Sequence, residues 1–313
     1  MRGTLLYLGQ RLILISITTV LVSSIVFLLL HQIPGNAFLN ETRQSPQSLA
    51  ADLHRFGLDL PLRQQYQDWV AGVLRGDLGE SLVNRGVHIT PLLMRETSVS
   101  ATVGAFALLV TVGLGLTLGV IAALRQNTWV DYLASSSAVV AYSIPSFVIA
   151  IFMLLIFGHY FFDWTQATVY YSPGWGDWTQ VPVPAVALGL PYASYVARLT
   201  RASMLETIRT DDVRTAWAKG LRARVVVTRH ALRNALIPVV TILGPLVTGI
   251  ITGSVVIENI FGIPGLGKEF ITSILARDYN IVIGVFTFYA ALVGLANLTV
   301  DMIYPMLDPR IRY

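Results

Sequence analysis

Long stretches without charged residues are the feature that most constrains this chain of 313 residues. Several reach about 20 residues, the length that a helix needs to cross the roughly 30 Å hydrocarbon core of a membrane. Only 13% of the residues are charged, whereas soluble domains carry about a quarter. A soluble domain would also repeat its apolar residues at the helical period of about 3.6 instead of in unbroken runs. The sequence therefore predicts an all-α membrane protein.

Six apolar runs predict six transmembrane helices. The runs cover residues 12–30, 99–124, 135–162, 183–202, 235–260 and 281–304. The first run resembles a signal peptide, but its 19 residues are not followed by a small-residue cleavage site, which favours an uncleaved anchor helix. Pro145 predicts a bend in the third run, because proline leaves a backbone carbonyl without its helical partner. Six spans place both termini on the same side of the membrane.

The distribution of charge predicts which side that is. Residues 207–233 contain seven basic and two acidic residues, and Arg2 and Arg11 precede the first span. The loop of residues 163–182, on the opposite side, has neither lysine nor arginine. Loops rich in lysine and arginine stay in the cytoplasm. The sequence thus predicts cytoplasmic termini, a cytoplasmic loop at residues 207–234 and an extracytoplasmic segment at residues 31–98.

The segment of residues 31–98 is long enough to form a small structure of its own. Pro61 suits the start of a helix, and Gly76 ends it. One apolar stripe at helical spacing follows the proline, formed by Tyr66, Trp69, Val70, Val73 and Leu74. Two interpretations remain open. The helix lies on the membrane surface, or it forms a vestibule wall over a pathway.

The basic loop of residues 207–234 predicts two helices joined at a corner. Two acidic residues suit the positive end of the first helix, Gly220 ends it, and a basic second helix is expected from Leu221 to Asn234. Small side chains at the corner would let another protein approach the backbone closely. The alternative is a plain basic loop that contacts anionic lipid. The candidate docking residues are Asp211, Asp212, Arg214, Thr215, Ala216, Ala218, Lys219, Gly220 and Leu221.

Two glycine motifs have less specific interpretations. Residues 262–268 fit Gly-x4-Gly-Lys, but a phosphate-binding loop continues with serine or threonine and follows a strand. Here Glu269 follows and an apolar run precedes, so we expect a turn that binds no nucleotide. In the second span, small residues predict close helix packing. These residues are Gly104, Gly113, Gly115 and Gly119.

Three polar residues fall at or within the last two spans. Glu258, Asn297 and Asp301 would be costly in hydrocarbon and should face protein or water. Each is either part of a transport pathway or a partner in a hydrogen bond between helices. The five histidines are scattered, the chain has no cysteine, and no catalytic motif is found. We therefore expect no metal, no cofactor and no nucleic-acid partner.

Several segments, in order along the chain, resemble permeases of ATP-binding-cassette importers in the peptide and nickel branch. The loop reads Arg-Thr-Ala-x-Ala-Lys-Gly-Leu from Arg214 and then His-Ala-Leu-Arg-Asn-Ala-Leu-x-Pro from His230. It departs from the general Glu-Ala-Ala pattern of this class at Arg214 and Thr215 but agrees at Ala216 and Gly220. The other matching segments are 56–62, 76–81, 198–206, 257–261, 264–267, 277–279 and 308–312.

This resemblance implies the type I importer permease fold, with residues 1–313 as a single transmembrane permease domain and the 207–234 loop as the coupling loop. It implies a non-catalytic subunit of a bacterial or archaeal cell membrane. The implied partners are a second homologous permease, two ATPase subunits, an extracytoplasmic solute-binding protein and membrane lipid. Peptides are the expected cargo, and nickel, haem or other small solutes remain open.

Two other classes of function remain as alternatives. A stand-alone channel or secondary carrier should show inverted repeats or a line of intramembrane charges, and no internal repeat is found in the sequence. An intramembrane enzyme needs a polar pair on facing helices, and the sequence offers no such pair.

Overall fold

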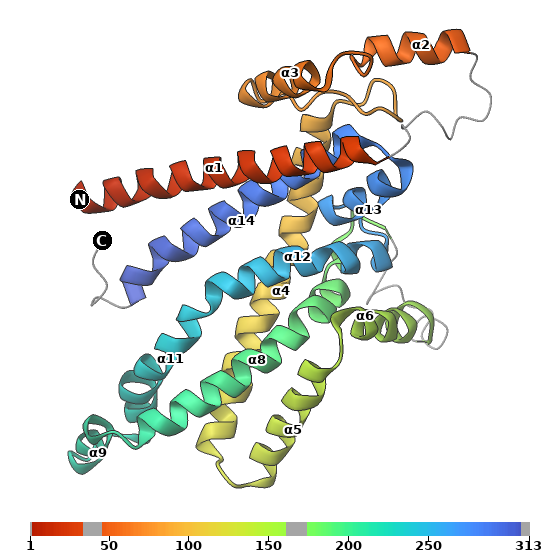
Figure 1. Ribbon diagram of the computed structural model, residues 1–313. Coiled ribbons are helices and arrows are strands. Elements are labelled where there is room, and N and C mark those ends of the chain that lie inside the picture. Colours follow the sequence, from red (N-terminus) through yellow and green to blue (C-terminus); the bar gives the residue numbers. More distant parts are fainter. Residues whose placement is uncertain (1, 34–45, 161–173, 308–313) are drawn as a thin grey trace. The chain divides into compact units, whose positions relative to one another are not determined.

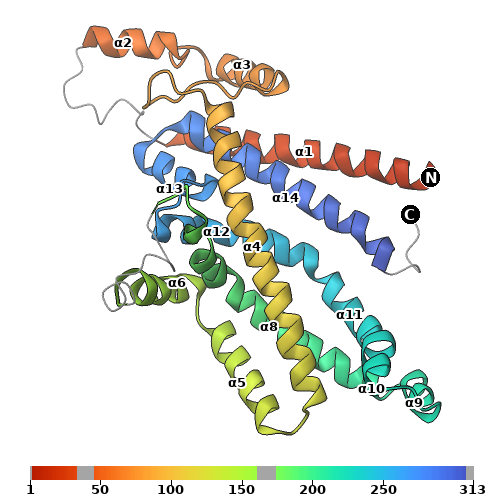
Figure 2. The same cartoon turned by 180° about the vertical axis from the view of Figure 1, so that it is seen from behind.

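The computed structural model describes residues 2–33, 46–160 and 174–307, and Figure 1 and Figure 2 show its helices from opposite sides. Within these ranges the chain is helical, and strand pairing is limited to one isolated bridge between Glu80 and His88. The predicted all-α class is confirmed. The C-terminal segment that resembles importer permeases, residues 308–312, lies outside the described residues, as do residues 163–173 of the loop predicted to lie on the opposite side of the membrane.

The chain forms two compact units. One comprises Met1–Val99 and Pro264–Leu295, and the other comprises Ser100–Ile263 and Ala296–Tyr313. The long helices α4 (Ile89–Leu124) and α14 (Tyr279–Leu307) contribute residues to both units.

In the first unit, α1 (Arg2–Gln32) packs along the first half of α14. The hydroxyl groups of Ser23 and Thr287 share a buried hydrogen bond of 2.9 Å. Further along, a Cβ on Gly294 would lie only 2.7 Å from the Ile15 side chain. A small residue and a buried hydroxyl pair thus let the two helices approach closely, as is common for helices packed in lipid.

The predicted helix of the 31–98 segment is confirmed as α3 (Leu62–Leu74), which follows α2 (Pro46–Arg55). The rings of Tyr66 and Trp69 lie 5.4 and 5.9 Å from the Phe27 ring of α1. The Tyr66 hydroxyl also makes a 2.7 Å hydrogen bond with the hydroxyl of Ser24. The predicted stripe is wrong at its last position, because Leu74 is 80% exposed.

One buried carboxylate ties the loop before α4 to the start of α14. Asp278 is 1% exposed and lies between α13 (Leu266–Ala276) and α14. It accepts hydrogen bonds from the backbone N–H groups of Leu82 and Val83, at 3.2 and 3.3 Å, and from the Ser81 hydroxyl. The same carboxylate accepts from the backbone N–H of Ile281 at 3.3 Å, in the first turn of α14.

The second unit is built around α8 (Pro182–Ile208), which packs against several other helices (Figure 1). Its neighbours are α5 (Trp129–Ser143), α6 (Ser146–Leu155), α11 (Leu232–Thr241) and α12 (Leu243–Phe261). Short helices and helical turns complete the unit, namely η2 (Ile156–Tyr160), η3 (Trp178–Gln180), α9 (Asp211–Ala218), α10 (Ala223–Val225) and η4 (Val226–Ala231).

Most of the predicted spans correspond to long apolar helices. Those that qualify among the described residues are Leu6–Gln32, Ile89–Leu124, Leu243–Phe261 and Tyr279–Met302. The third predicted run is not one straight helix, because α5 and α6 meet at an angle of 101° next to Pro145. The bend predicted from this proline is confirmed. The last two residues of that run, 161 and 162, lie outside the described part of the chain.

Two predicted spans differ from simple apolar helices for identifiable reasons. The fourth corresponds to α8, whose 27 residues span about 40 Å at 1.5 Å per residue, although Arg198 and Arg201 lower its hydropathy. Because other helices surround α8, it needs less apolar surface than a helix in contact with lipid. The fifth is broken into α11 and α12 at Ile242, one turn after Pro238.

Glycines on α4 allow that helix to contact α8. A Cβ on Gly115 would lie 2.7 Å from Val196, and a Cβ on Gly119 would lie 2.6 Å from the carbonyl oxygen of Ala197. The predicted packing role is therefore confirmed for these two glycines. It is wrong for Gly113, where a Cβ would meet no described atom within 4 Å. Helix α4 presents the Gly115 and Gly119 face to α8, and Gly113 lies off that face.

We predict that Gly119→Val lowers the unfolding temperature of the purified protein in detergent. The added side chain would have to displace backbone of α8, and overpacking of this kind costs about 1–3 kcal/mol. Gly113→Val is the matched control, since it adds the same side chain to the same helix in open space. Equal unfolding temperatures for the two variants would contradict the close contact between α4 and α8.

Candidate functional site

The loop that follows α8 begins with the short helix α9. Thr210 precedes it with an extended backbone, and its hydroxyl donates to the carbonyl of Thr207 at 2.7 Å. Asp211 and Asp212 occupy the first turn, where the positive end of the helix dipole stabilises their negative charge. Arg214 lies 3.6 Å from the carboxylate of Asp211, but both side chains are mostly exposed, so this ion pair adds little stability.

A left-handed glycine ends α9, as predicted. Gly220 has a φ of +74°, a value that residues with a side chain rarely adopt. Its N–H donates to the carbonyl of Trp217 at 2.9 Å, and the N–H of Leu221 donates to the carbonyl of Ala216 at 3.4 Å. These two hydrogen bonds form a Schellman motif, which satisfies carbonyl groups at the end of the helix. The corner therefore has a defined conformation.

One face of α9 is buried against the ends of longer helices. Val213 is fully buried, and Ala216 is 3% exposed. They belong to a cluster with residues of α4, α8, η4 and α11, which are Ala123, Met204, Val226, Ala231 and Ala235. Ala216 thus faces this cluster and does not present its side chain to a partner. A displacement of α9 would act directly on the ends of α4, α8 and α11.

The other face of α9 is open. The remaining predicted docking residues are all exposed, namely Asp211, Asp212, Arg214, Thr215, Ala218, Lys219, Gly220 and Leu221. Trp217 is not among the predicted docking residues, yet it is 48% exposed, and Leu221, four residues on, is 38% exposed. An aromatic residue among charged ones in a short loop helix is the signal that could have identified it, because tryptophan is enriched at the energetic centre of interfaces. This open face is called the α9 surface below.

The predicted second helix from Leu221 to Asn234 is confirmed in outline, because residues 223–234 are continuously helical, but it is not a regular α-helix. The stretch begins with the three-residue α10, continues through the π-helical turn η4 and runs into α11 at Leu232. A π-helical turn places residues five apart on one side of the helix. Val226 and Ala231 have this spacing and are both buried. The wider turn is therefore explained by the burial of these two side chains beneath α9.

The glycine motif at residues 262–268 is a turn between two helices. Gly262 ends α12 with a φ of +69°, and Gly265 directly precedes α13. A helix and not a strand comes before the motif, which is unlike a phosphate-binding loop. Glu269 is half-buried in the first turn of α13, and burial raises the pKa of its carboxyl above the usual value.

The three polar residues near the last two spans do not form a single site. Asn297 accepts a hydrogen bond of 3.4 Å from Thr248 on α12. Glu258 is fully buried on the same helix, but ten residues separate it from Thr248, or about 15 Å along the axis. Asp301 follows Asn297 by one turn on α14. No group of three or more potential metal ligands is found among the described residues.

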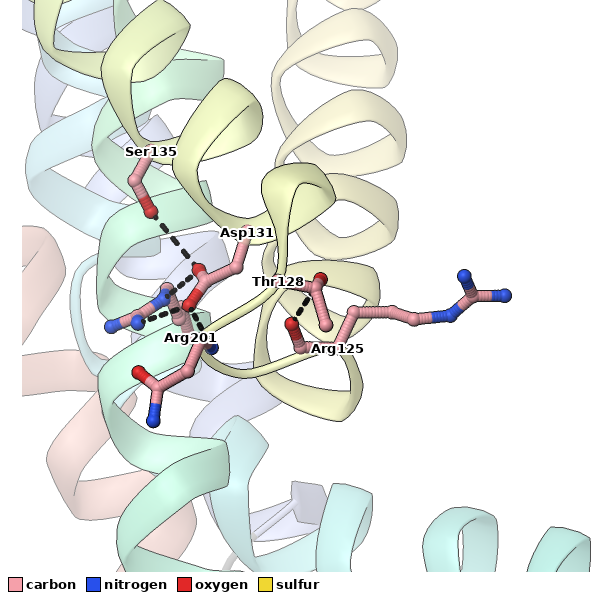
Figure 3. Close-up of polar contacts among 6 residues, drawn as sticks. Arg125, Thr128, Asp131, Ser135 and Arg201 are labelled. Carbon is pink, nitrogen blue, oxygen red and sulfur yellow. Dashed lines mark hydrogen bonds and ion pairs between the residues drawn. The ribbon is translucent and has the colours of Figure 1, made fainter.

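A buried ion pair joins α5 to α8 near the α9 end of α8 (Figure 3). The guanidinium of Arg201 donates to both oxygens of Asp131, at 2.6 and 2.7 Å. The same carboxylate accepts from the backbone N–H of Asn127 at 3.0 Å and from the Ser135 hydroxyl at 3.3 Å. Asp131 is 2% exposed, and these donors stabilise its buried negative charge. No local sequence pattern marks this pair, because its partners are 70 residues apart.

We predict that Asp131→Asn destabilises the protein by about 3 kcal/mol. Removal of one partner from a buried pair costs about 3–5 kcal/mol, and the lower value applies because the Arg201 side chain is 30% exposed. Thermal unfolding in detergent measures this loss. The control Ser135→Ala removes only one neutral donor and should cost about 1 kcal/mol. A loss in Asp131→Asn no larger than in the control would contradict the structural role of the pair.

Comparisons with known families cover almost the whole chain. Residues 115–313 match the family of binding-protein-dependent transport system inner membrane components. Residues 4–93 match the N-terminal membrane component of the same kind of transport system. The two matches together include α9, the Asp131–Arg201 pair and α3.

Individual relatives are similar along their full length. The chain is 38% identical over 307 residues to a dipeptide transport system permease protein of Bacillus subtilis, which covers 98% of this chain and 97% of that protein. It is 38% identical over 301 residues to an oligopeptide transport system permease protein of Salmonella typhimurium, which covers 95% of each.

A solved structure shares the fold. A chain of the MetNI methionine ABC transporter, in an inward-facing conformation, has a TM-score of 0.58 at 18% sequence identity. The match covers 70% of this chain and 98% of that chain. The predicted fold of a type I importer permease is thereby confirmed. By sequence, the chain belongs to the family of binding-protein-dependent transport system inner membrane components.

Proposed function

We propose that this chain is the permease subunit of an ATP-driven importer and forms half of a pathway for di- or oligopeptides. The observation that carries this proposal is the full-length similarity to two permeases named for dipeptide and oligopeptide transport. These relatives favour peptides over nickel, haem or another small solute. They also favour a subunit of a larger transporter over a stand-alone channel, a secondary carrier or an intramembrane enzyme.

The proposed complex contains a second homologous permease, two ATPase subunits and an extracytoplasmic solute-binding protein. The family description, which refers to binding-protein-dependent transport, supports the solute-binding protein. The fold shared with a chain of an ABC transporter supports the ATPases. In this proposal ATP hydrolysis belongs to the partner subunits, and this chain is not an enzyme.

The proposed contact with the ATPases is the α9 surface. Its exposed Trp217 and Leu221 would fill an apolar pocket, while Asp211, Asp212 and Arg214 would surround that contact with charge. The buried face of α9 supports a mechanical role, because it contacts the ends of α4, α8 and α11. The Asp131–Arg201 pair would extend the same movement to α5.

The proposed orientation places the 207–234 loop and both termini in the cytoplasm and the 31–98 segment outside the cell membrane, within a single permease domain of residues 1–313. The seven basic residues between 207 and 233 support this arrangement. Exposed Arg222, Arg224 and Arg229 would contact anionic lipid headgroups beside the docked ATPases. In this orientation α3 would stand over the outer end of α1, as part of a vestibule wall.

We predict that Trp217→Ala uncouples the transporter. A tryptophan at the centre of an interface contributes about 2 kcal/mol or more, so the variant should enter the membrane normally but lose the ATPases on purification. Trp129→Ala is the matched control, because Trp129 is 74% exposed and lies at the start of α5, outside the loop. Wild-type copurification and substrate-stimulated ATPase activity of Trp217→Ala would contradict the docking role.

Ala216→Glu should behave differently from Trp217→Ala. It would place a carboxylate in the apolar cluster beneath α9 and should therefore disorder the loop itself. Protease sensitivity of the loop separates the two effects. It should rise in Ala216→Glu and stay unchanged in Trp217→Ala. An equal rise in both variants would show that Trp217 supports the fold of the loop.

We predict that single cysteines at Gln47 and Asp77 react with an impermeant thiol reagent in intact cells. Both residues are exposed, and the chain has no other cysteine that could react. A cysteine at Lys219, in the α9 surface, is the control and should react only after the membrane is permeabilised. The opposite pattern would reverse the proposed orientation and contradict import.

A further inference from the structure

Two arginines one turn apart on α8 have different surroundings. Arg201 is committed to Asp131 through two hydrogen bonds. Arg198 makes no ion pair with any described carboxylate, and its Nε is buried without a hydrogen-bond partner in the described part of the chain. Its guanidinium carbon lies 4.4 Å from the centre of the Tyr142 ring. Among the described residues, an aromatic ring is therefore the one group seen to stabilise the positive charge of Arg198.

The position of Arg198 along α8 is not that of a residue at a helix end. Ten residues separate it from Ile208, the last residue of α8, or about 15 Å along the axis. Side chains on a helix lean toward its N-terminus, so Arg198 points away from the α9 end. Its partner Tyr142 is also remote from that end, since it lies eleven residues beyond Asp131 on α5, or about 16 Å. Arginines near helix termini extend their charge toward the nearer end of the helix, whereas Arg198 does not.

The aromatic contact orients the guanidinium. The Tyr142 ring stacks on the Tyr195 ring, with centres 6.0 Å apart and planes inclined by 26°. Tyr142 is 51% exposed, so this pair of rings has an open side. A guanidinium held over a ring face keeps its N–H groups in its own plane, where they can donate in parallel to one carboxylate. The three residues together make a charged, aromatic recognition surface of defined geometry.

We propose that Arg198, supported by Tyr142 and Tyr195, binds the C-terminal carboxylate of the peptide cargo as it crosses this half of the pathway. This inference rests on the proposed function in peptide import. A free peptide C-terminus is a planar anion that fits the parallel donors of a guanidinium. Tyrosine rings offer apolar contact to a peptide of any sequence. Arg201 is less suited to this role, because Asp131 already neutralises its charge and engages its Nε and one Nη.

The experiment compares one peptide with a free C-terminus and the same peptide with an amidated C-terminus. Uptake is measured in proteoliposomes that contain the complete transporter, with the solute-binding protein saturated by each peptide. The affinity of the binding protein for both peptides is measured separately by calorimetry. The wild-type transporter should take up the free form faster. This comparison requires no variant and isolates the permease from the selectivity of the binding protein.

Arg198→Gln should lower uptake of the free peptide by about tenfold or more, the usual effect of losing hydrogen bonds to a charged group, and should leave the amidated peptide unchanged. Arg198→Lys keeps the charge without the paired donors and should give an intermediate loss. Arg125→Gln is the matched control, since it removes an exposed arginine in the turn before α5, where Figure 3 shows its side chain directed away from Asp131. It should transport both peptides as the wild type does.

Three outcomes would overturn the assignment of Arg198 without contradicting peptide import. Equal uptake of the two peptides by the wild type excludes recognition of the carboxylate. An equal loss of uptake for both peptides in Arg198→Gln indicates that Arg198 pairs with a carboxylate of the second permease. Failure of the Arg198→Gln variant to assemble indicates that Arg198 is needed for folding. Absence of uptake of either peptide by the wild type would instead refute peptide import itself, and the assignment of Arg198 with it.

Discussion

The hydrocarbon core of a membrane offers no hydrogen-bond partner to the backbone, and the rest of this structure depends on that constraint. This chain meets the constraint with helices, and wherever a helix breaks, other groups must supply hydrogen-bond partners for its backbone. The sharp bend at Pro145 and the break at Ile242 both occur in helices that pack against α8. Protein contacts thus replace lipid where the backbone departs from a regular helix.

The same constraint governs charge. Asp131 and Arg201 are stable within the helical bundle because each satisfies the other and because Asn127 and Ser135 complete the carboxylate shell. Arg198 lies one turn away on the same helix, and its guanidinium lies over the Tyr142 ring, with no ion pair to a described carboxylate. Two residues of the same type therefore have different roles, one in holding helices together and one in the proposed recognition of cargo.

In the proposed transporter, the basic loop would connect these features to the ATPases. Its first helix is fixed at one end by the Schellman motif at Gly220 and beneath by the cluster around Val213. A rigid unit of this kind can transmit a displacement, whereas a flexible loop would absorb it. The half-exposed Trp217 lies at the edge of the buried face of α9, where the proposed partner subunit would apply that displacement.

The sequence by itself determined the helical class, most of the spans, the helix α3 and the glycine that ends α9, because each depends on local composition or on the conformation of single residues. The tertiary structure decided what depends on distant partners. The packing of α9 against α4, α8 and α11 buries Ala216 and leaves Trp217 half-exposed. The same packing favours the π-helical turn η4 beneath α9. Asp131 and Arg201 meet across 70 residues of chain, and no local pattern encodes that contact, because their pairing energy arises only when α5 and α8 pack together.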